Sequence, residues 1–253
     1  MLQLTKVNKA HFYLIGVGGT GAFFLESLCR LLAGRDDVTI DLYDGDTVES
    51  KNLKRQNFGV NDLDQNKAQA LATSLQQKIL RCPKLKVHAQ YLTDTSLIDE
   101  LALAPQNESP IIVDCTDNAA SRQLINQIVA GLEDAIDVIV LSSGNHDQGG
   151  QVVVWSNRPA QLQGLNGKQD VKLQSMTDLF PTTGEIKDQR DENPGITTTC
   201  GDQVESKPQA MMANVFNGNV LASLAFSLVN NETIAANVFR LNLSSLTITN
   251  QNI

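Results

Sequence analysis

The chain has 253 residues, of which 42% are hydrophobic, and a formal net charge of −8. This length allows one sizeable core, or one core with an appended lobe. The negative charge argues against a general nucleic-acid-binding surface, because phosphate backbones are bound by clustered Lys and Arg. The densest basic group is short and consists of Lys51, Lys54 and Arg55.

The cysteines and the apolar runs indicate the cellular compartment of the protein. None of the four cysteines, Cys29, Cys82, Cys115 and Cys200, has the C-x-x-C spacing. This usage is typical of a reducing compartment and predicts neither a disulfide framework nor a zinc site. No apolar run approaches the roughly 20 residues that span a bilayer, and the N-terminus lacks the hydrophobic region of a signal peptide. We therefore expect a cytoplasmic protein without a membrane span.

The N-terminal half alternates apolar runs with amphipathic segments. Residues 12–17 and 38–44 are expected to be buried strands, and the apolar residues from Ala22 to Leu32 recur at helical spacing between them. By the same reasoning, further strands are expected at residues 86–92, 110–115 and 135–142, and further helices at residues 68–79 and 119–131. This alternation indicates a parallel sheet with helices on both faces.

The second half is less regular. Gly149 and Gly150 precede an apolar run, and so tight a turn favours an antiparallel strand. Residues 158–207 lose periodicity, and we expect a flexible crossover segment there, held weakly by Met176, Leu179 and Phe180.

A long helix over residues 208–229 and a terminal strand over 238–249 are expected to complete the fold. The whole pattern predicts an α/β protein with a Rossmann-like three-layer sheet. Its N-terminal half is expected to be parallel, with antiparallel strands added, in a single domain over residues 1–253.

A glycine-rich turn lies where the first expected strand meets the first expected helix. Its glycines are Gly16, Gly18, Gly19 and Gly21. Glycines in this context let the backbone approach a phosphate, and the helix N-terminus offers free N–H groups. Asp44 follows the second strand at about the spacing of a ribose-binding carboxylate. An alternative is that Asp44 only forms a turn with Gly45.

The stretch D-G-D-T-V-E-S-K-N-L-K-R-Q at residues 44–56 is far more specific. It resembles the nucleotide-site signature of the ThiF, MoeB and HesA family, the bacterial relatives of ubiquitin-activating enzymes. The matching residues are Asp44, Asp46, Val48, Asn52, Leu53, Arg55 and Gln56. The resemblance extends over residues 11–157, is thinner through the crossover and returns near residues 208–229.

The resemblance implies an ATP site. Arg55 and Lys67 are expected to contact the phosphates, with hydrogen bonds from Asn52 and Gln56. A fork-shaped guanidinium and a mobile ammonium suit that task. For Lys67 the alternative is a solvated lysine in the first turn of a helix.

Two further residues have implied roles. Asp117, in D-C-T-D-N, is expected to hold Mg²⁺. It could instead cap the following helix, or do both in different states. Cys200 matches the family's crossover cysteine and is a candidate acceptor of the activated carboxylate, although no neighbouring base is evident except Lys207.

By resemblance, the protein would adenylate the C-terminal glycine carboxylate of a ubiquitin-like or sulfur-carrier protein, as a homodimer without zinc. Only about ten residues precede the first strand and none is arginine, so the arginine that many relatives lend to the neighbouring subunit is missing there. Two alternatives stay open. An NAD(P)-dependent oxidoreductase would explain the glycine turn and Asp44 but not N-L-K-R-Q, and a non-catalytic member would only bind a partner.

Overall fold

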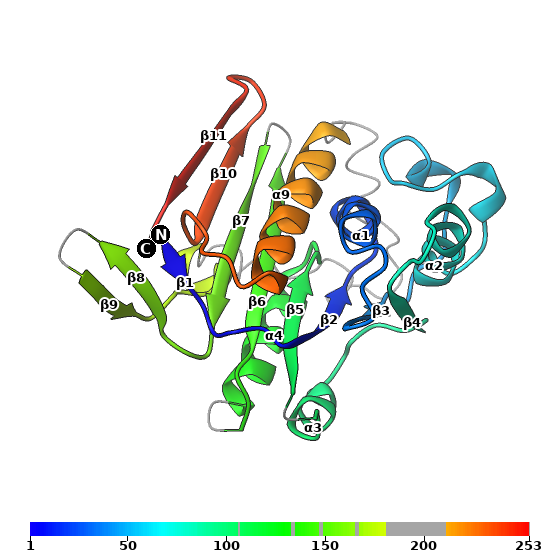
Figure 1. The fold of residues 1–253 in the computed structure, drawn as a ribbon. Coiled ribbons are helices and arrows are strands. Elements are labelled where there is room, and N and C mark those ends of the chain that lie inside the picture. The colour runs from blue at the N-terminus through cyan, green and yellow to red at the C-terminus, as the bar shows by residue number, and fades with distance from the viewer. Residues whose placement is uncertain (106, 133–134, 147–148, 165–166, 181–210, 253) are drawn as a thin grey trace.

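The computed structural model describes residues 1–105, 107–132, 135–146, 149–164, 167–180 and 211–252. An eight-stranded sheet forms its middle layer (Figure 1). From one edge to the other the strands are β11 (Thr247–Gln251), β10 (Val238–Asn242), β7 (Gly149–Ser156), β6 (Ile139–His146), β5 (Glu108–Asp114), β2 (Lys9–Ile15), β3 (Val38–Tyr43) and β4 (Lys84–His88).

The strand directions confirm the predicted architecture. The five strands from β6 to β4 pair in parallel. The strands β7, β10 and β11 are then added antiparallel to their neighbours. The antiparallel strand predicted after the glycine pair is thus confirmed, and Gly149 and Gly150 are the first residues of β7 itself.

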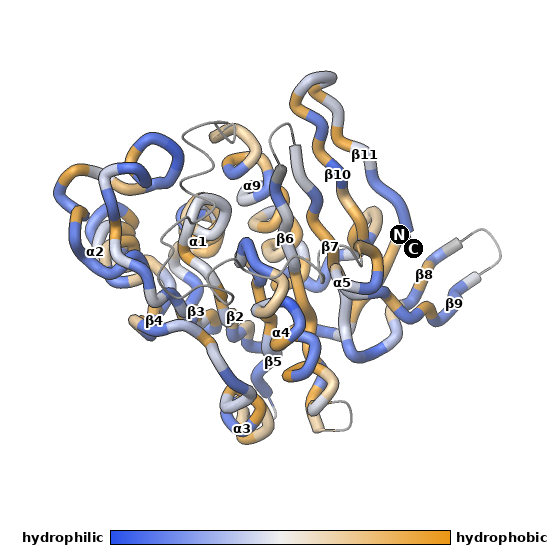
Figure 2. Tube along the Cα trace, turned by 180° about the vertical axis from the view of Figure 1, so that it is seen from behind, coloured by the Kyte–Doolittle hydropathy of each residue, from blue (hydrophilic) through white to orange (hydrophobic). Residues whose placement is uncertain are grey.

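Helices cover both faces of the sheet. One face carries α1 (Gly19–Leu31), α2 (Lys67–Lys78) and α9 (Met211–Val229), with α1 and α9 packed side by side (Figure 1). The opposite face carries the short α3 (Leu97–Ala102), α4 (Ala119–Gly131) and α5 (Met176–Leu179), which lie in front when the molecule is seen from behind (Figure 2). The three layers agree with the Rossmann-like prediction.

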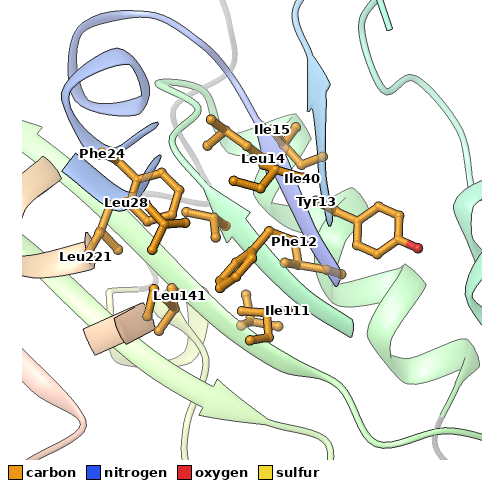
Figure 3. Packing of buried hydrophobic residues seen from close by; sticks show 14 of the residues in the cluster. Phe12, Tyr13, Leu14, Ile15, Phe24, Leu28, Ile40, Ile111, Leu141 and Leu221 are labelled. Atoms are coloured by element: carbon orange, nitrogen blue, oxygen red, sulfur yellow. The ribbon is translucent and has the colours of Figure 1, made fainter. Parts of the chain in front are cut away.

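Alternation along β2 divides the core between the two faces. Phe12 and Leu14 are fully buried on the side of α1, where Phe24 and Leu28 pack. Tyr13 points to the opposite side (Figure 3). Successive side chains of a strand point to opposite faces, so a strand buried on both sides is apolar almost throughout. This is why the run over residues 12–17 could be recognised from sequence.

Ionisable side chains occupy the face of the sheet to which Tyr13 points. Asp41 is fully buried, and its carboxylate lies 3.0 Å from His11 Nε2 and 3.4 Å from Lys86 Nζ. His88 Nε2 is 3.8 Å away, and the ring of His11 stacks on that of Tyr13. Burial raises the pKa of Asp41, but the hydrogen bond from His11 and the nearby positive charges lower it more. The net pKa lies below its ordinary value.

Replacing Asp41 with asparagine should lower the free energy of unfolding by roughly 2 kcal/mol, because it leaves His11 and Lys86 without their carboxylate. A carboxyl whose pKa is depressed by folding stabilises the protein above its unfolded pKa of about 3.9 and loses that effect below it. The difference between wild type and variant, measured by urea unfolding, should therefore shrink as the pH falls below about 4.

Asp37→Asn is the matched control, because its partner Arg35 is half-exposed and an exposed pair contributes less than about 1 kcal/mol. Equal losses in the two variants would contradict the role given to the buried cluster.

The first part of the segment over residues 158–207, where a flexible crossover was expected, contains strands. Residues 160–171 form a hairpin of β8 (Ala160–Gly164) and β9 (Gly167–Val171), and β1 (Leu2–Gln3) pairs with β8 in a small second sheet. The prediction of irregular chain is wrong there, because backbone pairing needs no apolar periodicity on an exposed strand such as β9. The predicted anchor is confirmed: Met176 is buried, and Leu179 and Phe180 pack against the core. Residues 181–207 lie outside the described part of the chain.

Two smaller expectations also differ. The predicted terminal strand over residues 238–249 is a hairpin of β10 and β11, with Leu246 in a left-handed conformation before β11. Helix α3 was not predicted, because its six residues are too few to show a helical period.

Helix α9 alone, among the described residues, is long and apolar enough to cross a membrane by length and composition. It was not expected to pass that test. It packs against α1, β6 and β7, and its buried residues include Leu221, Ala225 and Leu228. These contacts are those of a core helix.

Candidate functional site

Three segments predicted to carry the site meet at the carboxyl ends of β2, β3 and β5. The glycine turn follows β2, Asp44 follows β3 and D-C-T-D-N follows β5. Parallel strands end at the same edge of a sheet, which is where ligands bind in folds of this kind. The structure therefore brings these three candidate segments together at the carboxyl ends of neighbouring strands.

The glycine turn is shaped by two close backbone contacts. A Cβ on Gly21 would overlap the carbonyl oxygen of Gly16, and one on Gly16 would lie 3.0 Å from the carbonyl oxygen of Cys115. Gly16 also has φ of +89°, which favours glycine. At Gly18, the N-cap of α1, the space is open, with Gln56 Nε2 the nearest atom at 3.9 Å. The turn thus packs tightly inward and is open where a phosphate would approach α1.

Asp44 is held by the backbone. Its two carboxylate oxygens accept hydrogen bonds from Val17 N at 2.7 Å and Asp46 N at 2.8 Å. Burial raises its pKa despite the nearby ammonium of Lys67. The bond from Asp46 N forms the kind of turn expected if Asp44 had only a structural role. The bond from Val17 N connects the same carboxylate to the glycine turn. Each carboxylate oxygen can accept a second bond, so ribose binding is compatible with both.

Lys67 is buried at the start of α2 and is not the solvated lysine of the alternative interpretation. Its Nζ lies 2.7 Å from Asp46 Oδ2, and its backbone N donates to Asp46 O at 2.9 Å. Tyr91 donates its hydroxyl to the other carboxylate oxygen of Asp46. A triphosphate would find Lys67 already oriented but paired with this aspartate.

The N-L-K-R-Q stretch forms a compact turn. Asn52 is buried and accepts a bond from Glu49 N at 2.8 Å, while its carbonyl accepts from Arg55 N and Gln56 N. Gln56 Oε1 is buried beside the glycine turn without a hydrogen-bond partner in the described structure. A buried acceptor of this kind is costly unless a ligand or water supplies a donor. Asn52 therefore shapes the loop, and the hydrogen bonds expected from Asn52 and Gln56 to phosphate stay predictions.

The acidic turn after β5 contains a buried and an exposed aspartate. Asp114 accepts bonds from Thr116 N at 3.0 Å and Thr116 Oγ1 at 2.7 Å, and burial raises its pKa. Asp117 is exposed. The N-cap of α4 is Asn118, which accepts from Ser121 N at 2.8 Å, so the capping role considered for Asp117 is wrong.

The side chains near this turn that could bind a metal ion are relevant to the predicted Mg²⁺ site. Across the described ranges, no three His, Cys, Asp or Glu side chains are grouped closely enough to hold a metal ion. Mg²⁺ commonly takes one or two carboxylates together with substrate phosphates. Asp117 fits that limited role, and its binding of Mg²⁺ stays a prediction.

A pocket of about 650 Å³ lies beside Asp44, at the carboxyl ends of β3 and β4. Its lining includes Tyr43 and His88, whose rings stack with their centroids 4.2 Å apart. Tyr91 and Glu100 also line it, as does Gly45, the neighbour of Asp44.

Sequence reasoning missed several polar residues around the glycine turn: Thr20, Tyr91, Arg122, Asn145 and Asn214. Arg122 is buried on α4 and donates to the carbonyl oxygens of Thr116 and Ser143, at 3.1 and 3.0 Å. The sequence carries no local signal for these residues, because a buried polar side chain is retained when it is hydrogen-bonded and the partners here lie on other elements. Cys200 and the rest of residues 181–210 lie outside the described part of the chain.

A parallel sheet with a glycine turn, a buried ribose-type aspartate and a buried lysine at one edge defines a nucleotide-binding Rossmann-like protein. The model of the ThiF family matches residues 2–245, and the chain belongs to that family. The match covers the described site and the antiparallel strands β7 and β10, so the resemblance noted from residues 44–56 is confirmed.

Named relatives are similar over part of their length. The chain is 32% identical to the sulfur carrier protein ThiS adenylyltransferase of Escherichia coli over 152 residues, 59% of this chain and 54% of that protein. It is 35% identical to the adenylyltransferase and sulfurtransferase MOCS3 of Xenopus laevis over 130 residues, 50% of this chain and 26% of that protein. The aligned region is thus less than two thirds of either relative.

Solved structures share the fold. PaaA superposes with a TM-score of 0.62 at 16% identity, covering 98% of this chain and 65% of that one. Escherichia coli MccB with AMPCPP and MccA gives a TM-score of 0.60 at 16% identity, covering 97% of this chain and 64% of that one. At these identities the likeness concerns the architecture alone.

Proposed function

We propose that the protein binds ATP and adenylates the C-terminal carboxylate of a small ubiquitin-like or sulfur-carrier protein. The observation that carries this proposal is that the buried Lys67, the carboxylate of Asp44 and the open glycine turn meet at the carboxyl ends of β2 and β3. Two relatives that the chain resembles are named adenylyltransferases, one of them for the sulfur carrier ThiS. An oxidoreductase would leave the buried Lys67, which pairs with the partly exposed Asp46, without a purpose.

The site fits a nucleoside triphosphate. The pocket between Tyr43, His88 and Glu100 would take the base, and Asp44 would accept from the ribose hydroxyls. The free N–H groups at the start of α1 would face phosphate oxygens, where the helix dipole favours negative charge. Lys67 and Arg55 would supply the remaining positive charge.

In the proposed reaction a carboxylate oxygen of the partner attacks the α-phosphorus of ATP. The bond from that phosphorus to the bridging oxygen of the β-phosphate breaks, and pyrophosphate leaves with an acyl-adenylate formed. Charge builds on the phosphates in the transition state, and positioned cations lower its free energy. Mg²⁺, held by Asp117 and the phosphates, would contribute further positive charge.

Transfer from the adenylate to Cys200 forms the second part of the proposal. The thiolate would attack the acyl carbon, and AMP would leave as a thioester forms. Homodimer formation and a cytoplasmic location also stay predictions, and the homodimer is based on the family resemblance and the usual prevalence of symmetric pairs.

Calorimetric titration with ATP–Mg²⁺ and, separately, with NADH tests the nucleotide class. We expect ATP to bind and NADH not to bind. A C-terminal-glycine carrier protein from the same genome would then be assayed for its ability to drive exchange of labelled pyrophosphate into ATP, with the carrier lacking its terminal glycine as control. Binding of NADH in place of ATP would overturn the proposal, and ATP binding without exchange by any such carrier would favour a non-catalytic role.

A further inference from the structure

Asn214, in the first turns of α9, connects three parts of the site through one side chain. Its Oδ1 accepts hydrogen bonds from Thr20 Oγ1 at 3.3 Å and Asn145 Nδ2 at 2.5 Å. Its Nδ2 donates to the backbone carbonyl of Arg55 at 3.3 Å. These partners lie on α1, on β6 and in the N-L-K-R-Q turn, and Asn214 itself is only 3% exposed.

The packing around Asn214 leaves little freedom. A Cβ on Gly19 would overlap the amide of Asn214, so the first turn of α1 lies directly against this side chain. Asn145 also donates to Thr20 Oγ1 at 2.7 Å, which closes a ring of hydrogen bonds. One turn along α9, Asn217 extends the network and donates to Ser143 Oγ at 3.1 Å.

Buried amides of this kind are unfavourable in an apolar helix interface unless their hydrogen bonds are made. Packing alone would be served better by Leu or Ala, which occupy most of the buried positions of α9. Two other features show that the polar group has a local task. Its amide nitrogen donates to the carbonyl of Arg55, the residue expected to bind phosphate. Its amide oxygen accepts from the first turn of α1, the expected phosphate-binding helix.

We infer that Asn214 is a positioning residue, which fixes the Arg55 backbone and the start of α1 so that both face the triphosphate. Affinity for ATP then depends on the docking of the first turns of α9. The inference rests on the proposed function, in which the side chain of Arg55 acts on phosphate. Asn214 contacts only the backbone of Arg55 and therefore acts on that side chain indirectly. A positioning residue of this type acts through preorganisation, because a displaced cation loses much of its effect.

A double-mutant cycle tests this dependence with ATP–Mg²⁺ as the probe. We expect Asn214→Ala to weaken ATP binding about tenfold in calorimetry, with competition titrations used where the affinity is low. In an Arg55→Ala background the same change should have a clearly smaller effect, of about threefold, because no guanidinium is left to position and only the placement of α1 is still lost. A merely structural role would give equal effects in both backgrounds, and that result would overturn the inference.

Matched variants separate positioning from stability. Asn219→Ala removes an exposed asparagine on the same helix, which accepts from Ser27 Oγ on α1 at 2.7 Å, and should leave ATP affinity unchanged. Asn217→Ala should lower the melting temperature with a smaller effect on ATP affinity than Asn214→Ala. If Asn217→Ala weakens ATP binding as much, the role given to Asn214 is wrong.

Should Asn214→Ala fail to fold, Asn214→Asp provides a variant of equal size. It keeps the acceptor toward Thr20 and loses the donor toward Arg55. Repulsion of the triphosphate by the new carboxylate would persist in the Arg55→Ala background, whereas loss of positioning would not. Failure of the wild-type protein to bind ATP would overturn the proposed function and this inference together, whereas ATP binding with an additive cycle would overturn the inference alone.

Discussion

Replacing Arg55 and Lys67 together with alanine is expected to lower partner-dependent pyrophosphate exchange by at least about 1000-fold. Each cation would stabilise phosphate charge that grows in the transition state, and removing one such group commonly costs 10²- to 10³-fold in rate. Lys67 is buried and already oriented by Asp46, so no other described lysine can take its place.

The single variants separate the two roles. Lys67→Ala also leaves Asp46 without its cation, so its effect should exceed that of removing a phosphate contact alone. Lys54→Ala and Lys78→Ala are the controls, since both lysines are exposed. Lys54 precedes Arg55 in the turn, and Lys78 lies at the opposite end of α2 from Lys67. Exchange in the double variant that stays within a few-fold of wild type would show that the phosphate roles assigned to Arg55 and Lys67 are wrong.

Gly21→Ala is expected to destabilise the protein by at least about 3 kcal/mol, or to prevent folding. The new methyl group would occupy the space of the Gly16 carbonyl oxygen, which is backbone and cannot rotate away. Overpacking in a core costs 1–3 kcal/mol where side chains can adjust, and more where backbone must move. For a chain of this size the melting temperature should fall by roughly 10 °C, as measured by scanning calorimetry.

Gly18→Ala provides the contrast within the same turn. Its Cβ would meet nothing closer than 3.9 Å, so the fold should tolerate the change, with a melting temperature within about 2 °C of wild type. The methyl group would instead fill the open side of the turn, and affinity for ATP should fall at least tenfold. A Gly18→Ala protein that binds ATP normally would place the phosphates elsewhere.

The features that sequence predicted are those with a local signature. Residues 12–17 are apolar because β2 is buried on both faces. The glycines from Gly16 to Gly21 are recognisable because one tight turn requires them. The motif at residues 44–56 was recognised because its residues lie in one short, gapless stretch. Within that stretch Asp44 accepts a hydrogen bond from Asp46 N, and Asn52 accepts one from Glu49 N, so both side chains shape the loop locally.

The features that sequence missed depend on distant partners. Nothing local distinguishes Asn214 or Asn217 from a polar residue on a solvated helix face, because their partners are on β6 and α1. The hairpin of β8 and β9 was missed because an exposed strand needs no apolar alternation. Tyr91 is exposed and carries no motif, yet it reaches Asp46 across the loop after β3.

The bond between Thr20 and Asn214 joins residues 194 positions apart. During synthesis the glycine turn and Asp44 leave the ribosome early, and domains begin to fold as they emerge. The nucleotide site nevertheless cannot be completed until α9 has been made and has docked onto α1. A nascent chain that ends before α9 therefore exposes both the apolar side of α1 and an unfinished glycine turn, and ATP bound as proposed would stabilise the protein only after α9 has been translated.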